Sequence, residues 1–334
     1  MPRILLIPIL AVFATACDLA QSTRFLEIEA TGTLSGVVYF DGNGNRAADS
    51  SDRLLEDIGV RLVVEGTGDT TRSATTDVQG RYAIPSAPLG TYRLVVDPQD
   101  LGDTIDVVAA RVGGRTVPAD SPVTFTLGAG DSLFITVGLS YPAFEVAELR
   151  DRPVAEKAFV EGIALTPRSV FGDTTLHLAD TTGAIRATRV KASRFFGISP
   201  GDSLRLLGRR SVRDGQPTLD DVSWFVLGTT AAPPPDSLST AAAATAVDGD
   251  LDAALVRVSG AIVDTTTMES DFVLRVDDGS GPVDVVLDAD VAFDRTGMLP
   301  DTVVNAVGVL VPVVTGESLW MLKPRFQLDL EIDG

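Results

Sequence analysis

Residues 34–40 read Leu-Ser-Gly-Val-Val-Tyr-Phe, an apolar run rich in β-branched and aromatic side chains. Two runs of the same kind follow it, Val-Arg-Leu-Val-Val at 60–64 and Tyr-Arg-Leu-Val-Val at 92–96. Clusters of Gly, Asp, Asn and Pro separate such runs at spacings of roughly 8–12 residues, which is typical of β-sandwiches and barrels. No long stretch has a helical period, so the sequence predicts an all-β protein.

The second half of the chain contains an internal duplication. Phe-Val-Glu-Gly-Ile at 159–163 aligns with Arg-Val-Ser-Gly-Ala at 257–261, and Leu-His-Leu-Ala-Asp at 176–180 aligns with Leu-Arg-Val-Asp-Asp at 274–278, both at an offset of 98 residues. An ordered series of matches at one offset indicates repeated units. Each unit is predicted to have five strands, near 158–165, 175–180, 184–191, 203–209 and 222–227 in the first, and near 254–264, 272–277, 283–287, 302–311 and 319–330 in the second.

A glycine-rich hairpin between the second and third strands of each unit resembles that of an OB-fold barrel. The resemblance implies two OB-fold-like five-stranded barrels, placed behind one N-terminal domain. The predicted organisation is a signal peptide at 1–16, a tether at 17–31, a β-sandwich at 32–141, a first barrel at 142–228, a Pro/Ala linker at 229–247 and a second barrel at 248–334.

The N-terminus has the layout of a secretory signal. Arg3 precedes a short apolar run at 4–13, the small residues Ala-Thr-Ala follow at 14–16, and Cys17, the only cysteine, comes next. The run is too short for a stable transmembrane span. Cys17 after small residues resembles the lipobox of bacterial lipoproteins, which implies lipidation at Cys17 and an extracytoplasmic chain anchored to a membrane. The alternative is an ordinary signal peptide cut near residue 16.

A loop rich in oxygen ligands follows the first strand, at 41–52. Its positions 1, 3, 5, 9 and 12 carry oxygen side chains, and position 7 can offer a carbonyl, which matches the demand of Ca²⁺ for six to eight oxygen ligands. The EF-hand pattern has Gly at position 6 and Glu at position 12, where this chain has Arg46 and Asp52. The alternative is a turn whose side chains cap their own backbone. The candidate ligands are Asp41, Asn43, Asn45, Ala47, Asp49 and Asp52.

This loop and the runs at 36–41, 59–62, 76–84 and 89–94 resemble the B-type repeats of serine-aspartate-repeat bacterial surface adhesins. The resemblance implies a calcium-binding β-sandwich of the immunoglobulin-like or prealbumin-like type, stiffened by structural Ca²⁺. A second acidic series, Asp248, Asp250 and Asp252, lacks later ligand positions and is predicted to be a solvated turn or helix cap.

Basic residues gather in the predicted first barrel. OB-folds bind oligonucleotides or oligosaccharides on the face of their second and third strands, and single-stranded nucleic acid requires cations with aromatic platforms. Phe195, Phe196, Trp224 and Phe225 supply aromatic rings, with a barrel core as the alternative explanation. The candidate polyanion-binding residues are Arg186, Arg189, Lys191, Arg194, Arg205, Arg209, Arg210 and Arg213.

Composition excludes most catalytic chemistry. The formal net charge is −19, which disfavours polyanionic partners for the chain as a whole. His177 is the only histidine, so Ser-His-Asp triads and zinc sites built on several histidines are excluded. We therefore expect a non-catalytic binding or scaffold protein with a protein or glycan partner. The alternative is binding of single-stranded nucleic acid or another polyanion by the first barrel.

Overall fold

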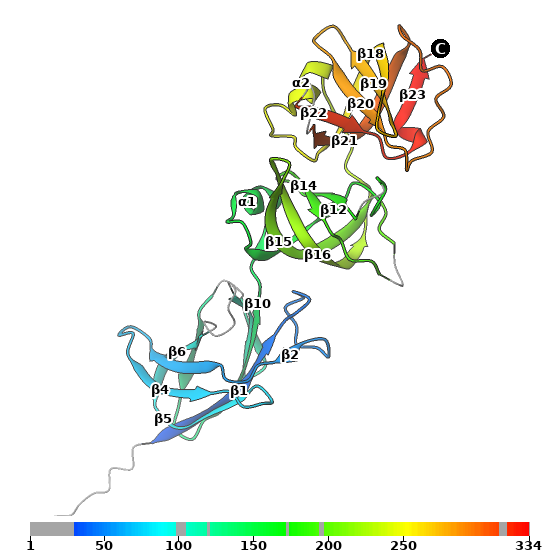
Figure 1. The fold of residues 1–334 in the computed structure, drawn as a ribbon. Helices are drawn as coiled ribbons and strands as arrows, with labels where there is room; N and C mark the ends of the chain where they lie inside the picture. The colour runs from blue at the N-terminus through cyan, green and yellow to red at the C-terminus, as the bar shows by residue number, and fades with distance from the viewer. Residues whose placement is uncertain are drawn as a thin grey trace, which may run out of the picture.

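A computed structural model of the protein describes residues 30–97, 105–118, 121–171, 174–193, 197–313 and 319–333. Three all-β units follow one another along the chain (Figure 1), as the sequence predicted. Cys17, the signal segment and Arg194, Phe195 and Phe196 lie outside the described residues. Within the described part, no helix has both the length and the apolar character needed to cross a bilayer.

The first unit is a sandwich of two sheets around a single core. One sheet contains β1 (Thr31–Phe40), β2 (Arg53–Leu54), β5 (Arg81–Pro88), β7 (Asp106–Val112), β8 (Arg115–Val117) and β10 (Ser132–Ser140), in the order β2-β1-β10-β7-β8 with β5 also paired to β1. The other contains β3 (Gly59–Val64), β4 (Thr70–Thr75), β6 (Gly90–Asp97) and β9 (Val123–Leu127), in the order β4-β3-β6-β9.

Strand β1 joins the two halves of its sheet, because it pairs in parallel with β10 and antiparallel with β5. Its inward residues Leu34 and Val38 are fully buried in the core. Gly36 lies between them at a close approach, where an added Cβ would fall 1.8 Å from the carbonyl oxygen of Ile135. The Tyr82 hydroxyl donates to that same carbonyl at 3.0 Å, so only glycine fits at this position.

The middle unit is a closed five-stranded barrel. Its strands are β12 (Lys157–Ala164), β13 (Leu176–Ala179), β14 (Ala184–Thr188), β15 (Asp202–Arg213) and β16 (Gln216–Thr229), preceded by β11 (Ala143–Phe144) and α1 (Val146–Asp151). The order β12-β13-β14-β16-β15 returns to β12, with β14 and β16 parallel and the other barrel pairs antiparallel. This is the strand order of an OB-fold, with apolar side chains filling the interior.

The third unit repeats that topology. Its barrel strands are β18 (Leu255–Met268), β19 (Asp271–Asp277), β20 (Val283–Leu287), β21 (Val303–Pro312) and β22 (Trp320–Lys323), with β17 (Asp236–Ser237) and α2 (Thr240–Thr245) before them and η2 (Gln327–Asp329) and β23 (Leu330–Asp333) after them. Strands β20 and β22 are parallel, and β23 adds to the edge of β21.

The repeat begins earlier than the sequence indicated. Strand β17 and helix α2 lie in the segment that we predicted to be a linker, yet they match β11 and α1 of the middle unit. In both units the first helical N–H donates to a hairpin aspartate, Val146 to Asp180 at 2.8 Å and Thr240 to Asp278 at 3.2 Å. The Ser239 hydroxyl caps α2 by accepting from the Ala242 N–H at 3.2 Å. Each helix is therefore part of its barrel.

Candidate functional site

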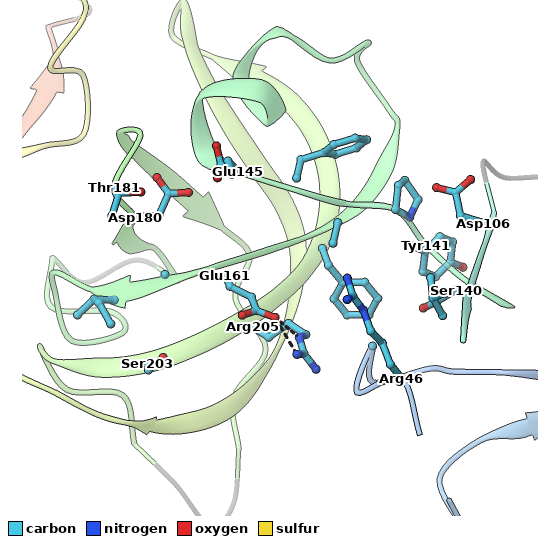
Figure 2. Close-up of a pocket in the computed structure, with 18 of the residues that line it drawn as sticks. Arg46, Asp106, Ser140, Tyr141, Glu145, Glu161, Asp180, Thr181, Ser203 and Arg205 are labelled. Carbon is cyan, nitrogen blue, oxygen red and sulfur yellow. Dashed lines mark hydrogen bonds and ion pairs between the residues drawn. The ribbon is translucent and has the colours of Figure 1, made fainter. Parts of the chain in front are cut away.

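A cleft of about 1000 Å³ lies between the sandwich and the first barrel (Figure 2). The connector 140–144 crosses it, between the end of β10 and α1. The start of β7 and the 41–52 loop contribute one wall, and β12, β15 and the hairpin after β13 contribute the other. The site is therefore built from segments that are far apart in the sequence.

Two contacts hold the barrel wall in place, one to the first-unit loop and one to the connector 140–144. Arg205 on β15 donates to the Asn43 carbonyl oxygen at 3.2 Å and pairs with Glu161 on β12 at 2.7 Å. The Phe159 ring is 2% exposed and lies 6.5 Å, centroid to centroid, from the Tyr141 ring. Arg205 is thus a link between two units, and its charge is compensated by Glu161.

Several polar groups remain accessible in the cleft, among them Thr181 and Glu161, the partner of Arg205. Asp106 and Arg46 are exposed on the first-unit side of the cleft, and Glu145 is exposed on the other side, at the start of α1 (Figure 2). Asp180 also lines the cleft, but its carboxylate accepts from the backbone of α1 and from the Thr182 hydroxyl, so it has a structural role. The sequence did not mark Asp106 or Glu145, and it marked Arg46 and Asp180 only within local motifs, because each becomes part of this site only when two units meet.

The predicted calcium loop is closed by hydrogen bonds among its own groups. Asp41 is fully buried and accepts from the backbone N–H groups of Asn45 at 3.2 Å and Arg46 at 2.7 Å. The Asp49 carboxylate accepts from the Ser51 hydroxyl at 2.5 Å and from the Asn45 side chain at 2.7 Å. These hydrogen bonds, led by Ser51, lower the pKa of Asp49 to about 2.

One carboxylate of the loop is incompletely satisfied. Asp52 accepts from the Asp49 N–H through Oδ2 at 2.8 Å, whereas its buried Oδ1 has no hydrogen-bond partner among the described residues. Burial, followed by the charges of Asp49 and Asp41, raises the pKa of Asp52. In the described part of the chain, no group of three or more His, Cys, Asp or Glu side chains is arranged to hold a metal ion. Calcium binding by Asp41, Asn43, Asn45, Ala47, Asp49 and Asp52 stays a prediction that requires the loop to rearrange.

Most of the candidate polyanion-binding residues are paired with carboxylates. Asp220 on β16 accepts from Arg189 at 2.8 and 2.5 Å and from Arg213 at 3.3 Å. Burial opposes ionisation of Asp220, but hydrogen bonds from Arg189, Thr188 and Arg213 outweigh it and lower its pKa to about 2. Three more candidates have acidic partners: Arg186 with Asp214 at 3.8 Å, Lys191 with Asp221 at 3.7 Å, and Arg205 with Glu161.

The remaining described candidates bind backbone. Arg209 donates to the Ala155 carbonyl at 3.1 Å. Arg210 is 7% exposed and donates to the carbonyls of Arg150 and Ser211, and burial lowers the pKa of its guanidinium. The structure therefore distributes these residues over several local contacts and does not bring them together as one uncompensated basic surface.

The outer face of β13 and β14, which OB-folds commonly use for ligands, is covered by the third unit. Leu165 and Ala184 of the middle unit share a buried apolar cluster with Leu255 and Val311 of the third. Arg325 of the third unit donates to the Leu165 carbonyl at 2.7 Å. The two barrels are therefore joined through the face that the alternative function would use for a nucleic-acid ligand.

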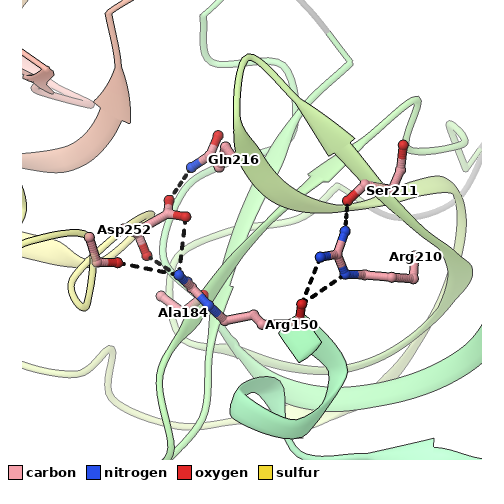
Figure 3. Close-up of polar contacts among 7 residues, drawn as sticks. Arg150, Ala184, Arg210, Ser211, Gln216 and Asp252 are labelled. Atoms are coloured by element: carbon pink, nitrogen blue, oxygen red, sulfur yellow. Dashed lines mark hydrogen bonds and ion pairs between the residues drawn. The ribbon is translucent and has the colours of Figure 1, made fainter. Parts of the chain in front are cut away.

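A polar cluster lies beside this apolar contact (Figure 3). Arg150 on α1 pairs with Asp252 at 3.2 Å and also donates to the carbonyls of Ala184 and Gly249. The Gln216 side chain donates to the other oxygen of Asp252. Our prediction that Asp248, Asp250 and Asp252 form a solvated turn or helix cap was wrong for Asp252, which is 2% exposed because the middle barrel covers it and which does not cap α2.

Comparisons with known proteins give no family for this chain. No family model and no curated protein matches it. Among solved structures, it resembles the Stn1–Ten1 complex of S. pombe (23% identity over 23% of this chain and 57% of that one, TM-score 0.19). It also resembles the Ifi202 HINa domain in complex with 20-bp dsDNA (14% identity, 55% and 97%, TM-score 0.26). A third is a putative carbohydrate binding protein from Pseudomonas aeruginosa (16% identity, 33% and 88%, TM-score 0.19). With every score this low, none of these resemblances bears on the ligand of this chain.

Proposed function

We propose that this chain is a lipid-anchored, non-catalytic binding protein of an extracytoplasmic membrane surface, whose ligand occupies the cleft between the sandwich and the first barrel. The cleft is the observation that carries the proposal. Its volume of about 1000 Å³ is in the range of small-ligand sites, and the ligand face of the first barrel is covered. The anchor is inferred from Cys17, and the sandwich next to it would carry the barrels away from the membrane.

The chemistry of the cleft favours a glycan as the ligand. Glu145 supplies an exposed carboxylate acceptor on one side of the cleft, and Arg46 and Asp106 supply an exposed donor and a second acceptor on the other. The Phe144 ring also borders the cleft, with the Arg152 guanidinium 4.5 Å from its centroid. A hydroxyl-rich ligand can use donors and acceptors of both kinds together with an apolar ring face, because each sugar hydroxyl both donates and accepts.

A glycan array probed with the intact chain in detergent, followed by calorimetry with the best glycan, tests this proposal. The variants Arg46→Ala and Glu145→Ala should each weaken binding by about tenfold, the value of one charge-assisted hydrogen bond. Arg93→Ala, on an exposed position of β6, is the matched control and should bind as the parent does. A glycan that binds the cleft variants and the parent equally well would contradict a site in this cleft.

Polyanion binding through the middle barrel is the alternative function. The pairing of Arg186, Arg189, Lys191, Arg205 and Arg213 with carboxylates leaves little net positive charge, and the third unit covers the ligand face. Tight binding of single-stranded DNA whose affinity falls steeply with salt would restore this alternative. The triple Ser variant of Arg209, Arg210 and Arg213 would then show whether these residues are responsible.

A further inference from the structure

A second, smaller cavity lies between the two barrels. Its volume is about 180 Å³. His177 on β13 and Arg186 on β14 line it from the middle unit, directly opposite each other in the strand pairing. Met321 and Lys323 on β22 line it from the third unit. The cavity is therefore completed only when the two barrels are in contact.

The imidazole of His177 is buried in this cavity without a partner. The residue is 1% exposed, and neither ring nitrogen has a hydrogen-bond partner in the described part of the chain. Its backbone N–H, in contrast, donates to the Thr166 hydroxyl at 3.0 Å, and its ring meets the Phe171 ring edge-on at 6.3 Å. A buried polar side chain with two unused nitrogens requires an explanation, and a bound polar ligand supplies one.

The electrostatic environment of the ring is positive. Burial, then the charge of Arg186 and then that of Lys323, lower the pKa of His177 to about 3. Both cations have acidic partners: Arg186 has Asp214 at 3.8 Å, and the Lys323 ammonium has Asp288 at 2.5 Å and Asp271 at 3.8 Å. The Asp214 carboxylate also lines the cavity and offsets part of the charge of Arg186 there, whereas the charges that shift the pKa of the imidazole are those of the two cations.

We propose that this cavity binds a small oxyanion, with inorganic phosphate as the model ligand. A neutral imidazole donates one hydrogen bond to the anion, and Arg186 and Lys323 supply the positive charge around it. The cavity volume equals the liquid share of roughly six waters, which leaves room for a tetrahedral oxyanion together with a few waters. The polar lining consists of Thr175, His177, Arg186, Asp214 and Lys323, and with two cations and one carboxylate it favours an anion over a metal ion.

The duplication supports a site that is specific to the middle barrel. At the offset of 98 residues, His177 and Arg186 correspond to Arg275 and Asp284, which are also opposite each other in the strand pairing. The third unit thus has a cation facing a carboxylate where the middle unit has a neutral imidazole facing a cation. We expect an anion to bind beside His177 and Arg186 in the middle unit and not beside Arg275 and Asp284 in the third.

Because His177 is the only histidine, labelling histidine with ¹³C at Cε1 gives one NMR signal from the intact chain in detergent. Titration with sodium phosphate at pH 7 should shift that signal saturably, whereas sodium chloride at matched ionic strength should not. The variants Arg186→Gln and Lys323→Met should each weaken phosphate binding by about tenfold, because each removes one charged partner. Arg93→Gln is the control and should bind as the parent does.

Two results would overturn the proposal. The first is a response to phosphate no larger than the response to chloride, which would mean that water alone fills the cavity. The second is saturable binding that Arg186→Gln, Lys323→Met and Arg93→Gln leave equally strong, which would place the anion elsewhere. If a cavity variant does not fold, the comparison of phosphate with chloride on the parent chain still decides.

Discussion

The guanidinium of Arg150 lies 3.2 Å from the carboxylate of Asp252, across the boundary between the two barrels. Arg150 belongs to α1, and Asp252 belongs to the turn that follows α2. The two side chains are 18% and 2% exposed, so both charges are largely removed from water. Arg150 also donates to carbonyls on both sides of the boundary, those of Ala184 and Gly249. One arginine thus connects a helix, a barrel strand and a turn of the neighbouring barrel.

Replacement of Arg150 by Met should destabilise the paired barrels by about 3 kcal/mol, because it leaves the Asp252 carboxylate buried without its countercharge. Equilibrium urea unfolding measures the change. The control is Arg189→Met, since the Arg189 side chain is 62% exposed and its pair with Asp220 should contribute less than about 1 kcal/mol. Equal losses in the two variants would contradict a special role for the contact between the barrels.

Local sequence signals were enough to predict the three units. Alternating apolar residues, such as Leu34 and Val38, define strands, and the glycine-rich turns around Gly183 and Gly281 separate them. The offset of 98 residues then predicted two copies of one barrel. The start of the third unit was missed because β17 is only two residues long and α2 is an alanine-rich turn of six residues, so neither has a distinctive pattern.

The contacts between units could not be predicted in this way. Asp252 follows two other acidic residues in a polar turn, and nothing near it in the sequence indicates its partner Arg150, 102 residues away. The basic residues of the middle unit looked like a charged surface, but strand pairing places Asp220 beside Arg189 and Arg213. A site between two units depends on how those units pack against each other, and short stretches of a single sequence do not indicate that packing.

Acid should weaken the contact between the barrels through His177. Its folded pKa of about 3 lies below the unfolded value of 6.5, so the unfolded chain binds the proton more readily. The contribution of the neutral His177 to the free energy of unfolding is fully present above pH 6.5. It decreases by about 1.4 kcal/mol for each pH unit below that value, until the folded pKa is reached. The charged groups around the ring are Arg186, Asp214 and Lys323, with Asp271 and Asp288 next to the lysine.

Urea unfolding of the parent chain between pH 7 and pH 4.5 measures this decrease. His177→Phe removes the titrating group, keeps an aromatic ring, and should show a shallower dependence on pH over the same interval. Asp220 also titrates, but its pKa is lowered to about 2, so its contribution is lost below pH 4 and does not interfere. Identical pH profiles for the two chains would exclude a buried neutral histidine at this position.

Calcium should stabilise the first unit if the 41–52 loop opens to bind it. Three carboxylates, those of Asp41, Asp49 and Asp52, lie in one loop, and the buried Asp52 Oδ1 has no partner among the described residues. A cation would relieve their mutual repulsion, at the cost of some of the hydrogen bonds that now close the loop. At a hundredfold excess over Kd, binding adds about 2.7 kcal/mol to the free energy of unfolding.

Thermal melts of the intact chain with calcium and with chelator test this expectation. Asp52→Asn should abolish most of the shift in melting temperature, because it removes the negatively charged ligand at position 12 of the loop. Asp77→Asn, which changes a carboxylate in a turn outside the loop, is the control and should keep the shift. Identical melting with calcium and chelator would mean that the loop binds no calcium and is held by its internal hydrogen bonds alone.

Replacement of Cys17 by Ser should release the protein from the membrane. Cys17 lies outside the described residues, and it is the only thiol of the chain, so no other side chain can accept a thioether-linked lipid. Each buried CH₂ of an acyl chain contributes about 0.8 kcal/mol to membrane binding, and several chains on one residue therefore give a stable anchor. In a bacterial host, the parent should fractionate with membranes and incorporate a labelled fatty acid, whereas Cys17→Ser should do neither. An intermediate result, membrane association without incorporation of the label, would mean that an uncleaved signal segment retains the chain, and it would contradict lipidation at this position.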